Sequence, residues 1–273
     1  MYDIEKTLFV SDLDGTLLRS DGTLCENTAK AINEMVSRGL KFSFATARSY
    51  YTAMRAAGGI VADIPLILHN GVFIRDSVTG ERLHCSLLDN LPFIKKVFDD
   101  CGLSPMVYSL DGLTERYTYV PELLSPEQAM MQAGRKNDPR DNPISDADRI
   151  WDGEAYYVLC IAKEERLRPA YEALRDDYNC IYGKDYYSGE LWLEIVHKQA
   201  SKASAVQKLR EILGCEKVVV FGDAHNDVPM FEIADEAYAV AGAADELKAR
   251  ATAVIGSNDD DAVVRWLREN VGI

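Results

Sequence analysis

The amino-acid sequence predicts an α/β fold, a doubly wound parallel sheet with an inserted α+β domain. Apolar strand-like stretches alternate with helix-like stretches in residues 1–80 and 191–273, a pattern that favours parallel strands joined by helices. Residues 217–221 are apolar after the first, as expected for a strand that is covered on both faces. The alternation changes in residues 81–190, which we predict to form the inserted domain, while the two flanking segments form the core.

The elements of the first core segment follow from its apolar spacing. Residues 8–12 are mostly apolar and end in an acid, which predicts a strand. Residues 24–38 have apolar side chains at helical spacing and are followed by Gly39, a residue type that often ends a helix. The remaining predicted elements are strand 41–45, helix 50–58, strand 65–69 and a hairpin of residues 72–75 and 82–85.

The inserted domain mixes strand and helix patterns and carries a polar loop with two prolines at residues 135–149. Its predicted elements are helix 88–101, strands 106–110 and 115–120, helix 125–134, strand 154–162, helix 164–177 and strand 180–187. The chain then returns to the core through residues 191–196. The last predicted elements are helix 202–212, strand 217–221, strand 237–240, helix 244–250, strand 253–255 and helix 260–269.

Composition limits the class of protein. The 273 residues carry a formal net charge of −14, which argues against binding to nucleic acid, because such proteins usually present a basic face. The N-terminus is too polar for a signal peptide, and no apolar run approaches the roughly 18 residues of a membrane helix. The six cysteines are scattered without metal-ligand spacing. We therefore expect a cytoplasmic protein with no membrane partner; the sequence leaves its oligomeric state open.

Two carboxylates at the end of the first strand are the main candidates for chemistry. Asp12 and Asp14 are two positions apart and are followed by a glycine. Ligands of open α/β sheets bind outside the carboxyl ends of the strands, and two acids placed there repel each other unless a cation binds them. Mg²⁺ takes carboxylate oxygens together with substrate phosphate, and an aspartate can attack phosphorus. The alternative interpretation of this stretch is a strand followed by an ordinary Asp-Gly turn.

Three later stretches place polar side chains at strand or helix ends. Thr46 follows a strand, where a hydroxyl can donate to phosphate, and Arg48 could pair with that phosphate or with an acid. Lys202 starts a helix although the helix dipole disfavours a cation there, which indicates function. Asp223 follows the apolar strand and is assigned to a metal. The next helix starts with Asn226 and Asp227, which could also serve as caps.

These four stretches together resemble the haloacid dehalogenase-like (HAD) phosphatases. They are Asp12-Leu-Asp-Gly-Thr-Leu-Leu, Phe44-Ala-Thr-Ala-Arg48, Lys202, and Gly222-Asp-Ala-His-Asn-Asp-Val-Pro-Met230. The last is similar to the Gly-Asp-x-x-Asn-Asp-x-x-Met pattern of the Cof-type sugar-phosphatase branch. The resemblance implies a HAD-like Rossmannoid core with the insert as a C2-type cap, of the C2B form, over the carboxyl ends of the core strands.

The resemblance also implies the roles of the residues. Mg²⁺ would be held by Asp12, the backbone carbonyl of Asp14 and Asp223. Asp227 would either bind the metal directly or orient Lys202 or a metal-bound water. Asp12 would be the nucleophile that forms an aspartyl phosphate, and Asp14 the general acid and base. The residues expected to bind substrate are Thr46, Arg48, Asn70 and Asn226, together with Lys202, which would neutralise the phosphoryl group. Asn70 could instead serve only a turn, and His225 lies in a variable slot of the motif and is not assigned a role.

The substrate expected from the resemblance is a small phosphorylated metabolite, best matched by a sugar phosphate. Nucleotides, pyridoxal phosphate and flavin precursors remain open, as do substrate contacts from Arg116, Lys184 and Trp192 in the insert. Two rival functions also remain. A sugar phosphomutase would pass the phosphoryl group to a sugar instead of water. A binding protein could keep the fold without chemistry, although the joint presence of the four charged site residues speaks against it.

Overall fold

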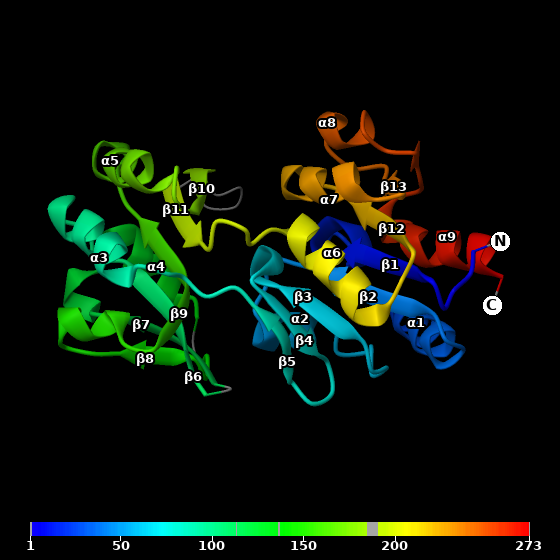
Figure 1. Ribbon diagram of the computed structural model, residues 1–273, viewed down its shortest axis with the longest axis horizontal. Coiled ribbons are helices and arrows are strands. Elements are labelled where there is room, and N and C mark those ends of the chain that lie inside the picture. The colour runs from blue at the N-terminus through cyan, green and yellow to red at the C-terminus, as the bar shows by residue number, and fades with distance from the viewer. Residues whose placement is uncertain (1, 113, 136, 185–190, 273) are drawn as a thin grey trace. The chain divides into compact units, whose positions relative to one another are not determined.

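The computed structural model of the protein describes residues 2–112, 114–135, 137–184 and 191–272. These residues fold into two compact units (Figure 1). The first, here called the core unit, comprises the chain up to Cys85 and again from Ala200. The second, here called the insert unit, comprises Ser86–Gln199. No helix among the described residues is long and apolar enough to cross a membrane.

The core unit is built on an eight-stranded sheet in the order β14-β13-β12-β1-β2-β3-β4-β5. The first six strands of that order run parallel, and β4 and β5 complete the sheet as antiparallel strands. The central strand is β1, which is buried along its whole length. The strands are β1 Thr7–Asp12, β2 Lys41–Ala45, β3 Pro65–Leu68, β4 Phe73–Asp76, β5 Arg82–Cys85, β12 Lys217–Gly222, β13 Glu236–Ala239 and β14 Ala253–Val254.

Helices cover both faces of this sheet because alternate residues of its strands point to opposite sides. Leu8 and Val10 of β1 pack in one cluster with α6 residues such as Val206. Phe9, which lies between them, contacts Trp266 of α9 with ring centroids 6.5 Å apart. The predicted doubly wound α/β fold is therefore confirmed. The helices are α1 Glu26–Ser37, α2 Tyr50–Ala56, α6 Lys202–Leu213, α7 Val228–Ile233, α8 Asp245–Lys248 and α9 Ala262–Val271.

The insert unit has a six-stranded sheet in the order β10-β11-β9-β6-β7-β8. Within the described part of this unit, β7 and β8 are the one parallel pair. Helices α3 and α5 cover one face of this sheet, where Phe98 and Leu167 pack with Val158 and Leu193. The elements are α3 Leu91–Asp100, β6 Met106–Asp111, β7 Thr114–Tyr119, α4 Pro126–Ala133, β8 Asp141–Pro143, β9 Glu154–Ile161, α5 Glu164–Leu174, β10 Asn179–Lys184 and β11 Leu191–Val196.

The structure differs from the sequence prediction at both junctions between the units. Strand β5 pairs with β4 in the core sheet, so the insert unit begins at Ser86 instead of residue 81. Strand β11, predicted to lead back into the core, pairs with β9 and β10 because its apolar residues fill the insert's own core. The classification of the insert as a C2B cap stays a prediction.

Two other segments of the insert unit can be compared with their predicted structure. The polar segment 135–149 is not wholly a loop, because it contains β8 and the start of a 3-10 turn over Ala147–Trp151. The predicted strand 180–187 corresponds to β10, and its residues 185–187 lie outside the described residues.

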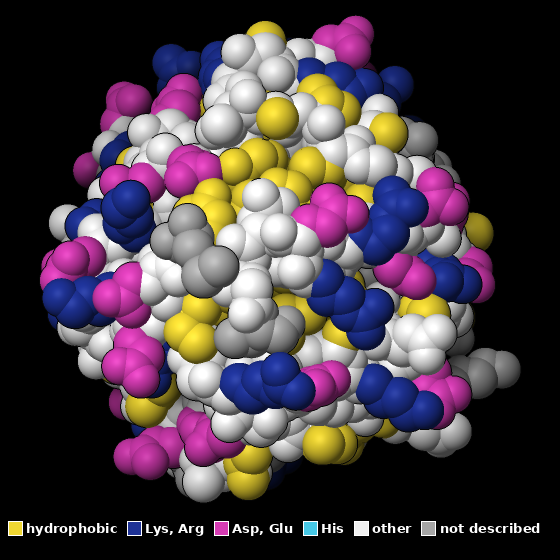
Figure 2. Space-filling view, turned by 90° about the vertical axis from the view of Figure 1, so that its right-hand side faces the viewer, with side chains coloured by type: hydrophobic (Ala, Val, Ile, Leu, Met, Phe, Trp, Pro, Cys, Tyr) yellow, Lys and Arg dark blue, Asp and Glu magenta, His cyan; other side chains and the backbone are white. Residues whose placement is uncertain are grey.

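The surface around the two chain ends of the core unit is mixed in charge. Figure 2 views the molecule from that side and shows lysine and arginine side chains lying next to aspartate and glutamate. Ion pairs on the core unit such as Lys6–Glu216 and Arg38–Glu34 belong to such a surface. Exposed pairs of this kind contribute little to stability, so the fold depends on the apolar packing described above.

Candidate active site

Three neighbouring parallel strands bring the predicted site residues to one edge of the core sheet. Strand β1 ends at Asp12, β2 is followed by Thr46, and β12 is followed by Asp223. The strand register aligns these strand ends, because Asp12 lies opposite Ala45, and Ser11 lies opposite Phe221. The carboxyl edge of a parallel sheet is where such folds bind ligands.

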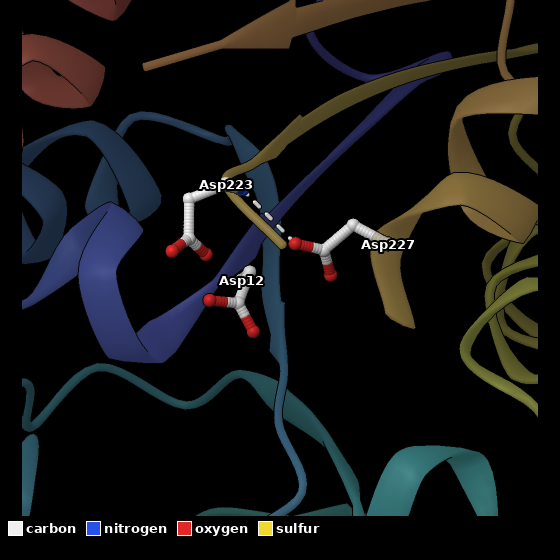
Figure 3. A group of neighbouring side chains, drawn as sticks. All are labelled: Asp12, Asp223 and Asp227. Carbon is white, nitrogen blue, oxygen red and sulfur yellow. Dashed lines mark hydrogen bonds between the residues drawn. The ribbon is translucent and has the colours of Figure 1, made fainter. Parts of the chain in front are cut away.

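Three carboxylates form an acidic cluster at this edge. Each of Asp12, Asp223 and Asp227 offers one oxygen atom, and these oxygens lie within 4.8 Å of one another. Figure 3 shows the three side chains directed toward one another from β1, from the end of β12 and from the turn that follows it. Asp12 and Asp227 are buried, which makes their mutual repulsion costly without a cation. Burial first, and the charge of Asp227 second, raise the pKa of Asp223 to about 6.

Lys202 supplies one buried positive charge to this cluster. Its Nζ donates to Asp12 Oδ1 at 2.5 Å and to Asp227 Oδ1 at 2.6 Å, and the residue is only 2% exposed. Burial disfavours the ammonium, but the charges and hydrogen bonds of the two aspartates outweigh it and raise the pKa of Lys202 above its ordinary value. Three carboxylates against one ammonium leave an excess of negative charge, which a divalent cation would neutralise.

Asp227 already has donors on both of its oxygens. Lys202 donates to Oδ1, and the backbone N–H of Ala224 donates to Oδ2 at 3.1 Å. The backbone N–H of Asp223 also donates to Oδ2, at 3.0 Å (Figure 3). Of the two roles expected for Asp227, these contacts support the orientation of Lys202. Direct coordination of a metal by Asp227 stays a prediction.

The turn after β1 is shaped around Asp223. Gly15 has a φ of +77°, and a Cβ added there would lie 2.4 Å from Asp223 Oδ2, so only glycine fits. Thr16 Oγ1 donates to Asp223 Oδ1 at 3.1 Å. Thr16 was not among the site residues predicted from the sequence. Its place two residues after Asp14, in a turn beside a strand end, was the available signal.

Asp14 lies outside the acidic cluster and pairs with Arg48. The guanidinium donates from Nε to both carboxylate oxygens, at 3.1 and 2.8 Å, and from Nη2 to Oδ1 at 2.6 Å. The sequence left open whether Arg48 meets phosphate or an acid, and in the structure it meets this acid. The predicted contribution of Asp14 to the metal, through its backbone carbonyl, stays a prediction, as does a phosphate contact of Arg48.

A three-residue turn after β3, here called the arch, packs against the start of α6. His69, Asn70 and Gly71 all have positive φ. At Gly71 a Cβ would lie 2.0 Å from the backbone oxygen of Ser201, so the absence of a side chain lets the arch reach the residue before Lys202. The amide of Asn226 donates to Asn70 Oδ1 at 3.3 Å, which brings two predicted substrate-binding residues together.

The other predicted residues are spread over both units. Thr46 is fully buried, and its Oγ1 accepts from the backbone N–H of Arg48 at 3.1 Å. His225 is exposed, and its Nδ1 lies 3.0 Å from Glu246 Oε2. Arg116 of the insert unit pairs with Asp111. In the β10–β11 pair, Lys184 lies opposite Leu191, and Trp192 lies opposite Gly183. Contact of Lys184 and Trp192 with substrate stays a prediction.

The sequence model of the haloacid dehalogenase-like hydrolase family matches residues 9–267, nearly the whole chain. The protein belongs to this family. A relative of this HAD-like hydrolase in Bacillus subtilis (strain 168) is named 5-amino-6-(5-phospho-D-ribitylamino)uracil phosphatase YwtE. It is 28% identical over 279 residues, covering 94% of this chain and 95% of the relative. A second phosphatase of that name in the same organism, YitU, is 26% identical over 270 residues and covers 96% of each chain.

Solved structures support the fold of this HAD-like hydrolase. TM0651 from Thermotoga maritima superposes with a TM-score of 0.80 at 24% identity, covering 98% of this chain and 97% of the other. A haloacid dehalogenase-like hydrolase from Bacteroides thetaiotaomicron gives a TM-score of 0.77 at 21% identity, covering 96% and 98%. The assignment from the motifs, a HAD-type phosphatase of the Cof type, is confirmed by the family match and by relatives named as phosphatases.

Proposed function

We propose that the protein is a Mg²⁺-dependent phosphomonoester hydrolase that acts on a small phosphorylated metabolite derived from a sugar, through an aspartyl-phosphate intermediate. The observation that carries this proposal is the buried contact between Asp12 and Lys202 beside Asp223. A carboxylate held by an ammonium, next to a second acid at a strand end, has the components needed to attack phosphorus and neutralise its oxygens.

The donor set of the site fits Mg²⁺. The acidic cluster offers only carboxylate oxygens, which this ion prefers, and it lacks a sufficient positive charge of its own. Asp12 and Asp223 would hold the ion, with the carbonyl of Asp14 as a further ligand. When bound, Mg²⁺ would supply positive charge that neutralises the phosphoryl oxygens and the carboxylates around them.

In the first step, an oxygen of Asp12 forms a bond to phosphorus while the bond from phosphorus to the ester oxygen breaks. The departing oxygen takes a proton from the carboxyl of Asp14, which becomes a carboxylate. Lys202 remains protonated and neutralises negative charge on Asp12 and on the phosphoryl group. Thr46 and Asn226 would donate to the phosphoryl oxygens, with Asn70 as a further predicted contact.

In the second step, a water oxygen attacks the phosphorus of the aspartyl phosphate and gives one proton to Asp14. The bond between phosphorus and the Asp12 oxygen breaks, which releases inorganic phosphate and restores the Asp12 carboxylate. Uncatalysed phosphate-monoester hydrolysis is so slow that the site must lower its barrier by on the order of 20 kcal/mol. Positioning and charge neutralisation by fixed groups are the means that this site offers.

The proposed substrate class rests on the names of two relatives, while the site itself supports a phosphoryl group. Two relatives at 28% and 26% identity are named for a phosphorylated ribityl compound, which is a sugar-derived monoester. For this chain we propose the wider class of sugar-derived phosphates, which includes that compound.

The test is a release assay for inorganic phosphate over a panel of sugar phosphates, sugar-alcohol phosphates, nucleotides and pyridoxal phosphate. We expect hydrolysis that EDTA abolishes and added Mg²⁺ restores, with the highest kcat/KM among sugar-derived monoesters. A rate unaffected by EDTA would contradict the metal requirement. Transfer of the phosphoryl group to a sugar bisphosphate, without release of phosphate, would favour a phosphomutase instead.

A further inference from the structure

The geometry around Asp14 indicates a function for Arg48 other than binding phosphate. Its Nε and Nη2 both donate to the Asp14 carboxylate, so the edge of the guanidinium that suits a bidentate anion is already used. The remaining Nη1 is 3.5 Å from the backbone oxygen of Thr52. The Asp14 side chain is 43% exposed and that of Arg48 is 28% exposed, so the pair remains accessible from solvent.

The backbone of Arg48 is fixed on both sides. Its N–H donates to Thr46 Oγ1 at 3.1 Å, and its carbonyl accepts from the N–H of His69 at 3.0 Å. The next residue, Ser49, caps helix α2 by accepting from the N–H of Thr52. These contacts fix the point from which the side chain starts, and its planar guanidinium then matches the geometry of a carboxylate.

Asp14 is paired, among the described residues, with the side chain of Arg48. It lies in the irregular turn Leu13–Leu17, directly before Gly15, whose φ is +77°. The hydrogen bonds that its carboxylate accepts, as described above, come from Arg48. Proton transfer requires the carboxyl to lie within hydrogen-bond distance of the reacting oxygen, so the orientation of this side chain bears directly on the rate.

We propose that Arg48 is a positioning residue that orients the Asp14 carboxyl toward the oxygen of the leaving group. This inference rests on the proposed function and refines it, because it assigns Arg48 to proton transfer instead of to phosphate. The two roles differ in what they predict. A phosphate contact is the same for every monoester, whereas a proton donor matters most when the leaving group is a poor one.

The experiment measures kcat/KM for a series of aryl phosphates, from p-nitrophenyl to p-methoxyphenyl phosphate, which differ in the pKa of the phenol but little in size. This parameter covers the steps up to phosphorylation of Asp12, so the later role of Asp14 as a base does not enter it. The variants are Arg48→Met and Arg48→Lys. Arg55→Met, an exposed arginine of α2, is the matched control.

We expect both Arg48 variants to show a loss that grows with the pKa of the phenol, reaching about 10²-fold for the poorest leaving group. Lysine should not restore the wild-type dependence, because it lacks the planar fork. In an Asp14→Asn background, Arg48→Met should not change the dependence further. Arg55→Met should follow the wild type, and thermal unfolding should show that all variants are folded.

A loss of equal size for every aryl phosphate, accompanied by an equal weakening of inhibition by inorganic phosphate, would overturn the inference and assign Arg48 to phosphate binding. Multiplicative losses in the Asp14→Asn background would overturn it as well. If the wild-type protein hydrolysed no phosphomonoester at all, the proposed function itself would fail, which is a distinguishable result.

Discussion

At the scale of single residues, the site is defined by which buried charges neighbour each other. Asp12 could not be buried at the end of a central strand without the ammonium of Lys202 beside it. Asp14, only two residues later, is partly exposed and is paired with Arg48. The two acids therefore have different surroundings, one paired with an ammonium inside the protein and the other with a guanidinium near its surface.

Replacing Asp12 by Asn should lower kcat by at least about 10³-fold, because an amide oxygen does not form the aspartyl phosphate. The fold should persist, since Lys202 retains its bond to Asp227. Steady-state kinetics and thermal unfolding measure the two effects. Asp245→Asn, at an exposed position, serves as the control. Activity within tenfold of the wild type would remove Asp12 as the nucleophile.

Replacing Lys202 by Met should destabilise the metal-free protein by about 3 kcal/mol, because the buried acids lose their cation. Mg²⁺ should recover part of this loss by neutralising the same carboxylates. Thermal unfolding in EDTA and in Mg²⁺ compares the two conditions, with the exposed Lys208→Met on the same helix as control. Melting temperatures that do not respond to Mg²⁺ in either protein would argue against a metal at the acidic cluster.

At the scale of elements, close packing between the arch after β3 and the start of α6 places Lys202. The contact depends on Gly71, whose φ is +99° and whose missing side chain leaves room for the backbone of Ser201. Helix α6 is in addition capped by Ser201, which accepts from the N–H of Ser204. The cap and the arch together determine where the lysine enters the cluster.

Gly71→Ala should therefore destabilise the protein by more than about 2 kcal/mol and lower its activity, because strain at positive φ is joined by a clash with backbone. Gly214→Ala at the other end of α6 is the matched control. Its φ is also positive, at +65°, but a Cβ there would meet nothing within 4 Å. Chemical denaturation of both variants separates strain from clash. Equal losses would mean that the approach of Ser201 contributes nothing.

The insert unit offers a pH-dependent element of its own. Burial tends to raise the pKa of Asp138, but hydrogen bonds and charge from Arg140 outweigh it and hold this pKa below its ordinary value. A carboxyl whose folded pKa is lowered stabilises the fold above its unfolded pKa of about 3.9, and this contribution is lost as pH falls through the folded pKa.

Asp138→Asn should accordingly reduce stability by about 2 kcal/mol at pH 7, and the difference from the wild type should shrink as the pH falls below about 4. Urea unfolding at pH 7 and at pH 3.5 checks this. The exposed Asp176→Asn should show no such difference at either pH. A loss that stayed the same at both pH values would show that the charge of Asp138 is not what stabilises the unit.

At the scale of the whole molecule, the core unit could be predicted because the sequence shows where its strands end. The carboxyl ends of parallel strands meet at one edge of a sheet. Asp12, Thr46 and Asp223 could therefore be placed together from the sequence alone. The sequence did not show in the same way which sheet a strand joins. The pattern of β11 shows a strand, but pairing with β9 and β10 depends on which core its apolar residues fill.

Side-chain partners were the other part that the sequence could not provide. Arg48 has a long side chain within reach of several acceptors, and only the backbone course around it selects Asp14. The hydrogen bond from Thr16 to Asp223 joins residues 207 positions apart, so no local sequence pattern predicts it. Long-range choices of this kind follow from the assembled fold.

The contact between Asp12 and Lys202 also joins residues 190 positions apart. A ribosome therefore produces Asp12 early, and Lys202 and Asp223 only after the insert unit has been translated. A nascent chain that stops within the insert has the acid without its counterion. Under the proposed function such a truncated chain would be unable to transfer phosphate, and turnover would require translation past residue 227.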